Sequence, residues 1–136
     1  MTLLEQIERD EGYRQFAYAD SVGVWTVGIG RNLESKGVSR EEARYLAQND
    51  LNECTAALRR DLPYFDGLSE ARQGVLINMA FNLGVAGLLK FDKMLTAVGG
   101  GYYKEAAKEM INSTWARQVG DRARRLAQQM ETDQWI

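Results

Sequence analysis

The sequence of 136 residues contains no histidine, one cysteine (Cys54) and one proline (Pro63). Without histidine, the chain cannot build a Ser-His-Asp or Cys-His nucleophile system or a histidine-bound zinc centre. A single thiol excludes an internal disulfide and a multi-cysteine metal site, and it fits folding in a reducing cytoplasm. Acid–base chemistry therefore falls to carboxylates, lysine or tyrosine, and we expect no metal and no cofactor.

The chain also lacks a large net charge and a long apolar run. Its net charge is -2, so it has no basic excess of the kind that indicates nucleic-acid binding. The short basic run Arg122, Arg124 and Arg125 has no interleaved aromatics, and we interpret it as a solvated helix face with one functional arginine. No apolar run approaches a membrane span, and the acidic N-terminus has no signal-peptide core. We expect synthesis in a host cytoplasm, no membrane insertion and a monomer.

Hydrophobic periodicity predicts a mostly helical α+β domain, long enough for one core and with room for two lobes. Ser39 with Glu42 forms a capping box at the start of a long helix, and Ser69 caps a later helix that is apolar nearly all round over residues 75–83. A hairpin or small three-stranded sheet is expected over about 14–33. The other predicted helices are 3–11, 91–98, 103–111 and 121–130, and the long helix runs over about 39–60.

Residues 11–30 are the part of the chain around which the rest is organised. Leu4, Ile7 and Glu11 recur at helical spacing, which predicts that Glu11 lies on a core-facing stripe and is desolvated. Gly12 is suited to end the helix, so Glu11 also lies at the negative end of the helix dipole. Both effects favour a protonated carboxyl at neutral pH.

Asp20 lies in a polar turn before a segment with a period of two. In residues 25–30 one face is apolar, and the other carries Thr26 and two glycines, so another group can lie against it. One carboxyl group in an apolar setting and a second carboxyl group in a solvent-exposed turn form the arrangement that glycoside hydrolysis requires. A capped helix leading into a hairpin, with an incidental acid at each end, explains the pattern equally well.

Two further features leave alternatives open. Asn78 and Asn82 interrupt the apolar helix at i, i+4: they are either satisfied core amides or, for the later one, a side chain that reaches a cleft. The tryptophans Trp115 and Trp135 are interpreted as packing residues rather than as platforms for sugar stacking.

Three motifs occur in order along the chain. The first is E-x8-D-x5-T followed by G-I-G over residues 11–30; the second is A-x5-I-N-M-x-F-x-x-G over 71–84; the third is S-x-W and, seven residues after the tryptophan, R-A-x-R, over 113–125. Together they resemble the phage-type lysozymes, the muramidases of glycoside hydrolase family twenty-four. The likeness covers most of the chain and is strongest over 1–31 and again over 68–84 and 112–125.

The resemblance implies a small lobe with the sheet (about 12–60), a helical lobe (about 61–136 together with helix 1–11), and a peptidoglycan cleft between them. Glu11 is expected to be the general acid, Asp20 the base or electrostatic partner, and Thr26 the residue that holds the attacking water, with inversion. The implied bond is the β-1,4 link from N-acetylmuramic acid to N-acetylglucosamine. The residues expected to line the substrate site are Asn82, Phe81, Trp115, Gly30 and Leu33.

Supporting contacts are implied as well. Arg122 is expected to pair with Glu11 from the far lobe. Arg31 stands where the family usually has a histidine, and we expect it to pair with Asp50 and to keep its charge at all relevant pH values. The segment between the sheet and the long helix is short, so the small lobe is expected to cover fewer sugar subsites.

Three roles remain in competition. An endolysin is the main interpretation. A lytic transglycosylase needs one acid and no water-activating partner, so Asp20 and Thr26 argue against it. A wall-binding module or phage tail structural protein with the same fold would not need Glu11, Asp20 and Thr26 together.

Overall fold

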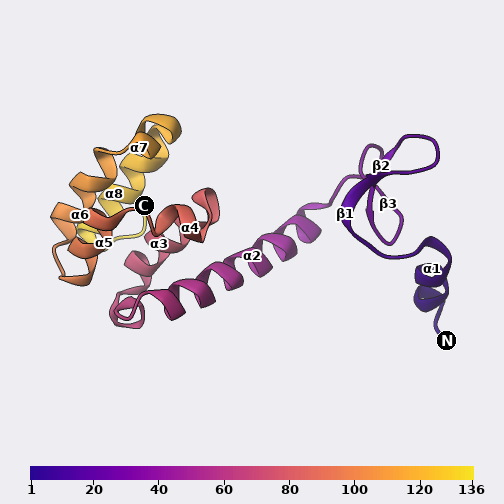
Figure 1. Ribbon diagram of the computed structural model, residues 1–136, viewed down its shortest axis with the longest axis horizontal. Coiled ribbons are helices and arrows are strands. Elements are labelled where there is room, and N and C mark those ends of the chain that lie inside the picture. Colours follow the sequence, from indigo (N-terminus) through magenta and orange to yellow (C-terminus); the bar gives the residue numbers. More distant parts are fainter. The chain divides into compact units, whose positions relative to one another are not determined.

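The computed structural model describes residues 1–136 and contains eight α-helices, one short 3-10 helix and one three-stranded sheet (Figure 1). The mostly helical α+β class predicted from the sequence is confirmed. The chain divides into two compact units, Met1–Leu46 and Ala47–Ile136, and the division falls within helix α2 (Arg40–Asp61). Helix α1 (Leu3–Glu11) groups with the sheet in the first unit; its expected place with the helical lobe stays a prediction.

Helix α1 has the predicted bounds, because its sequence carries a clear start signal at one end and a clear stop signal at the other. Thr2 and Glu5 form a reciprocal capping box, with the Glu5 N–H donating to Thr2 Oγ1 over 3.1 Å and the Thr2 N–H to Glu5 Oε2 over 2.7 Å. Gly12 ends the helix at φ +77°, and its N–H donates to the Glu8 carbonyl over 2.7 Å. Glu11 is therefore the last residue of the helix.

The sheet is an antiparallel meander in the order β1-β2-β3, with β1 at Arg14–Ala19, β2 at Trp25–Gly28 and β3 at Arg31–Asn32. Strand β2 is central, so Thr26 lies opposite Tyr18 on β1 and opposite Asn32 on β3. The β1–β2 register shifts between Arg14 and Tyr18, which marks a bulge in the edge strand.

Within the first unit taken by itself, the α1 stripe is not buried, and its burial against the helical lobe stays a prediction. Leu4 is 65% exposed, Ile7 is 41% exposed, and Glu11 is exposed too. The physical reason is that the first unit has no hydrophobic core of its own: every buried hydrophobic side chain lies between Leu58 and Met130. Helical spacing predicts which residues share a face, whereas burial also requires a surface for that face to pack on.

The second unit holds the core. The 3-10 turn η1 (Phe65–Gly67) leads to helix α3 (Glu70–Leu83). Its residues Val75, Leu76 and Met79 are fully buried, so the prediction of a central buried helix is confirmed. The other helices of this unit that follow α3 are α4 (Val85–Leu88), α5 (Asp92–Gly99), α6 (Tyr103–Ile111), α7 (Thr114–Val119) and α8 (Asp121–Thr132) (Figure 1). None of the helices has both the length and the apolar character that crossing a lipid bilayer would require.

Two of these helices were not expected from the sequence. Helix α4 begins directly after Gly84 and contains Gly87, and these two glycines predict a break in the chain rather than a helix; α4 is only one turn long. Helix α7 begins after Ser113, whose hydroxyl accepts the Ala116 N–H over 3.1 Å. That cap is a recognisable start signal, so α7 could have been predicted.

The C-terminal residues pack back on helix α3. A Cβ atom at Gly74 would lie 2.5 Å from the Trp135 ring, so only glycine leaves room for this contact. The tail is also held by Asp133, which bonds with the Ser69 hydroxyl, and by the Ile136 N–H, which donates to Gln129 Oε1 over 3.4 Å. Trp135 is thus a packing residue, as predicted, although 67% of it remains exposed.

Candidate active site

Glu11 lies directly against the backbone of Gly30. A Cβ atom at Gly30 would lie 3.0 Å from Glu11 Oε2 and 3.1 Å from its carboxyl carbon, and Gly30 adopts φ +66°. Both the conformation and the close approach require glycine. The structure therefore brings the end of α1 to the turn that follows β2. The sequence predicted Gly30 as a substrate contact but missed its role in making room for the Glu11 side chain.

Asp20 is fixed by the turn that it closes. Its Oδ1 accepts the Val22 N–H over 2.9 Å and the Val24 N–H over 2.8 Å, and its own N–H donates to the Val24 carbonyl over 2.9 Å. These side-chain bonds hold the carboxylate in one orientation and use only one of its oxygens. Oδ2 is left as an acceptor for a group outside the turn.

Thr26 is the only buried residue of the first unit, at 5% exposure. Its hydroxyl donates to the Val24 carbonyl over 2.9 Å, so the hydroxyl oxygen keeps its lone pairs to accept another hydrogen bond. The Val24 residue thus touches both candidates, since its N–H binds Asp20 and its carbonyl binds Thr26. Leu33, another predicted contact, is half-buried and donates its N–H to the Trp25 carbonyl over 2.8 Å.

Arg31 has a partner that the sequence did not predict. Its Nη1 donates to Glu42 Oε1 over 2.9 Å and to the Gly37 carbonyl over 3.0 Å, while its Nη2 binds the other Glu42 oxygen. The expected fork on a carboxylate is present, but the carboxylate within the first unit is Glu42. Asp50 belongs to the second unit, and its pairing with Arg31 stays a prediction.

The hydrogen bond from Arg31 is the main reason why the pKa of Glu42 falls to about 2, helped by bonds from Ser39. Glu42 is also the second member of the predicted capping box, which is confirmed: the Ser39 N–H donates to Glu42 Oε1 over 2.8 Å, and the Glu42 N–H donates to Ser39 Oγ over 3.1 Å. The same contact with Glu42 raises the pKa of Arg31, so the arginine stays charged.

Replacing Glu42 with glutamine should lower the melting temperature at neutral pH and have no effect in strong acid. A carboxyl with a depressed pKa contributes stability above its unfolded pKa of about 4.3, and this stability is lost as pH falls through the folded value near 2. Glutamine keeps the capping interaction and removes the charge, so the change isolates the ion pair.

Thermal melts of the parent and of Glu42→Gln at pH 2, 4 and 7 measure this effect. The exposed Glu41→Gln on the same helix turn serves as the control, since it removes an equal charge without a partner. A difference between parent and Glu42→Gln that persists unchanged at pH 2 would contradict the assignment.

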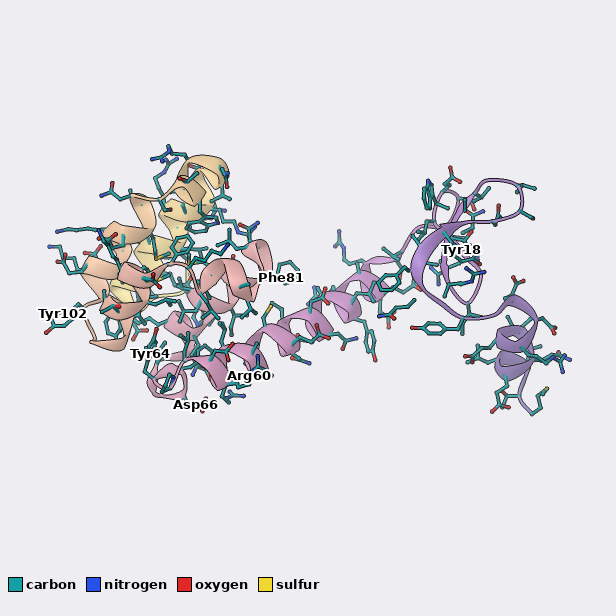
Figure 2. The ribbon with its side chains drawn as sticks, viewed as in Figure 1. Tyr18, Arg60, Tyr64, Asp66, Phe81 and Tyr102 are labelled. Carbon is teal, nitrogen blue, oxygen red and sulfur yellow. The ribbon has the colours of Figure 1, made fainter.

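The second unit joins two of the predicted substrate residues. The indole Nε1–H of Trp115 donates to Asn82 Oδ1 over 2.8 Å, and Trp115 is only 3% exposed. Trp115 is therefore a packing residue whose polar atom is satisfied by Asn82. That these two residues line the substrate site stays a prediction. Phe81, beside Asn82 on α3, is 46% exposed. Its side chain is labelled in Figure 2.

Arg122 is held by Asn78 across α8 and α3. Its Nε and Nη2 donate to Asn78 Oδ1 over 3.0 and 2.8 Å, so Asn78 is the satisfied amide that the sequence allowed. Both residues line a groove of about 430 Å³ together with Phe81 and Trp135. The pairing of Arg122 with Glu11 would join the two units, and it stays a prediction.

Comparison with known proteins fits this arrangement. The model of the family described as phage lysozyme matches residues 8–132. The pre-baseplate central spike protein Gp5 of Enterobacteria phage T4 is 32% identical over 93% of this chain, which spans 27% of that protein. The probable T4-type lysozymes 1 and 2 of Dictyostelium discoideum are 28% and 26% identical, over 96% of this chain and 94% of each relative.

The matched region includes every residue assigned to the candidate site, from Glu11 to Arg122. The aligned lengths of 154 to 161 positions exceed the 136 residues of the chain, so these relatives carry residues that this chain lacks. The chain belongs to the phage lysozyme family.

Proposed function

We propose that this protein is a muramidase that hydrolyses the β-1,4 link from N-acetylmuramic acid to N-acetylglucosamine in peptidoglycan. The observation that carries the proposal is the site in the first unit, where Glu11 lies against Gly30 while Asp20 and Thr26 bond to the same residue, Val24. Membership of the phage lysozyme family supports a glycoside hydrolase.

Each side chain has a distinct task in this mechanism. Glu11 protonates the oxygen of the leaving sugar, and Asp20 steadies the positive charge that develops on the ring or takes a proton from water. Thr26 accepts a hydrogen bond from the attacking water, because its own proton is committed to Val24. Arg122 pairs with Glu11, and Asn82, Phe81, Gly30 and Leu33 contact the glycan. The water attacks from the face opposite the acid, so the product is inverted.

We infer a role as an endolysin, made in the host cytoplasm and acting on peptidoglycan after the inner membrane is breached. The T4 relative is named as a spike protein, which favours a second candidate role as the wall-penetrating module of a phage tail. Both roles use the same hydrolysis, and they differ in whether the protein is found free in the lysate or attached to purified phage particles.

The test is a turbidity assay with the full chain on chloroform-treated Gram-negative cells, followed by analysis of the released sugars. Hydrolysis gives a reducing muramic acid end, whereas a lytic transglycosylase gives a 1,6-anhydro sugar. Proton NMR taken during the reaction identifies the first anomer formed. The α-anomer supports inversion, the β-anomer supports retention, and absence of clearing contradicts the enzymatic function.

A further inference from the structure

Two side chains of strand β1 lie on the face of the sheet that carries Thr26. In an antiparallel pair, residues directly opposite each other project to the same face. Tyr18 lies opposite Thr26, and Arg14 lies opposite Gly28. This face has little side-chain bulk of its own, because Gly28 has no side chain. Arg14 and Tyr18 therefore border the surface against which another group can lie.

The bulge in β1 brings these two side chains together. Between the two pairs β1 advances by four residues and β2 by two, and such a bulge re-aims the side chains of the bulged strand. The guanidinium carbon of Arg14 lies 4.7 Å from the centroid of the Tyr18 ring, which is labelled in Figure 2. Tyr18 is half-buried, whereas Arg14 is exposed. The attraction between cation and ring thus holds the guanidinium at the solvent edge of the Thr26 face.

Arg14 is the cation of the sheet whose donors are unused. The strands contain two cations, Arg14 and Arg31, and Arg31 donates to Glu42 and to the Gly37 carbonyl. The guanidinium of Arg14 contacts the Tyr18 ring and makes no hydrogen bond or ion pair within the chain. The ring covers one face of the guanidinium and leaves the N–H groups at its edge free to donate. A guanidinium held in this way fits a planar carboxylate, which it binds through two parallel hydrogen bonds.

The proposed substrate carries such carboxylates. In peptidoglycan, the N-acetylmuramic acid units bear peptides with free carboxylate groups, whereas N-acetylglucosamine is uncharged. A substrate carboxylate is repelled by Asp20 and by the net charge of -2 on the chain. A cation on the Thr26 face offsets this repulsion close to the residues that the proposed mechanism uses.

We propose that Arg14 is a specificity-determining residue that binds a carboxylate of the peptide on N-acetylmuramic acid, so that the enzyme prefers peptide-bearing wall to neutral glycan. The inference rests on the proposed muramidase function, because it places that substrate on the Thr26 face. The contact is made with a part of the substrate that does not react. Its loss should therefore raise KM more than it lowers kcat.

The test compares purified Gram-negative sacculi with the same sacculi after their peptide carboxylates have been converted to amides. With the full parent chain, amidation should lower kcat/KM for the release of dye-labelled fragments about tenfold, mainly through KM. Arg14→Gln should show a similar loss on native sacculi and less than about twofold further loss on amidated sacculi, because the two changes remove the same contact. Arg14→Lys keeps the charge without the planar fork, so its kcat/KM should lie between those of the parent and Arg14→Gln.

Arg44→Gln is the matched control, because Arg44 is an exposed arginine of the same unit that lies on α2 and not on the sheet. This variant should respond to amidation as the parent does. Equal losses for Arg14→Gln and Arg44→Gln, or a parent that does not distinguish the two substrates, would overturn the proposal. Should Arg14→Gln fail to fold in thermal melts, an Arg14→Lys variant with the full parental preference for native sacculi would also overturn it.

A binding measurement separates this proposal from the proposed function. Co-sedimentation of Glu11→Gln with sacculi reports binding without hydrolysis, and adding Arg14→Gln to this variant should weaken the binding to native sacculi about tenfold. Binding that depends on Arg14, together with no hydrolysis by the parent, would contradict the muramidase function and support the carboxylate contact. Hydrolysis by the parent, together with binding that neither Arg14→Gln nor amidation changes, would overturn the carboxylate contact alone.

Discussion

A Glu11→Gln variant is expected to clear chloroform-treated cells at least about 10²–10⁴-fold more slowly than the parent, the usual cost of a lost general acid. The amide keeps the size and shape of the side chain and its position beside Gly30, but it cannot give a proton to the leaving oxygen. The melting temperature should stay the same or rise, because the change removes a functional carboxyl from the end of a helix.

Glu8→Gln is the matched control for this variant. Glu8 is an exposed carboxylate on the same helix, and only its backbone carbonyl is used, by the Gly12 N–H. The Glu8→Gln variant should clear cells at the rate of the parent protein. Clearing at the parental rate by Glu11→Gln would remove Glu11 from the mechanism, and an equal loss in both variants would point to the charge of α1 instead.

Replacing Gly30 with alanine should reduce lysis about 10²-fold, the effect that a misplacement of about 1 Å has on a catalytic group. The new methyl carbon would lie 3.0 Å from Glu11 Oε2, so the carboxyl must move away from its position against the turn. The left-handed conformation at φ +66° adds a stability cost of about 1–2 kcal/mol for a residue with a side chain.

Gly28→Ala separates these two effects. Gly28 has φ +68°, nearly the same as Gly30, but a Cβ atom there has nothing within 4 Å. Both alanine variants should therefore lose similar stability in thermal melts, while only Gly30→Ala should lose most of its activity below its melting temperature. An equal loss of activity in the two variants would mean that backbone strain, rather than contact with Glu11, is responsible.

Local structure was predictable from the sequence because its signals are local. Helices α1 and α6 have the predicted bounds, and the capping box of Ser39 and Glu42 is confirmed. Side-chain and backbone groups three or four residues apart decide such features. The turn at Asp20 is of the same kind, since aspartate commonly accepts N–H groups from the next few residues.

Contacts between distant residues were harder to predict. Both Glu42 and Asp50 lie on α2, eight residues apart, and nothing in their spacing decides which of them Arg31 reaches. The close approach of Glu11 to Gly30 depends on the path of the chain through the sheet, and the glycine pattern indicated only that some group could lie there. The family resemblance placed both Asn82 and Trp115 at the substrate site, and the two side chains are hydrogen-bonded. Hydrophobic periodicity alone carries no such information about residues far apart in the sequence.

The location of the hydrophobic core, which lies wholly between Leu58 and Met130, has a consequence for how the protein tolerates mutation. Regions with few buried apolar contacts open locally at low free-energy cost, and well-packed helices open only with the whole structure. Taken by themselves, residues 1–46, which hold Glu11, Asp20 and Thr26, have few buried apolar contacts. Random substitutions that abolish lysis without lowering abundance should therefore cluster before residue 46, whereas those that deplete the protein should fall in the later helices.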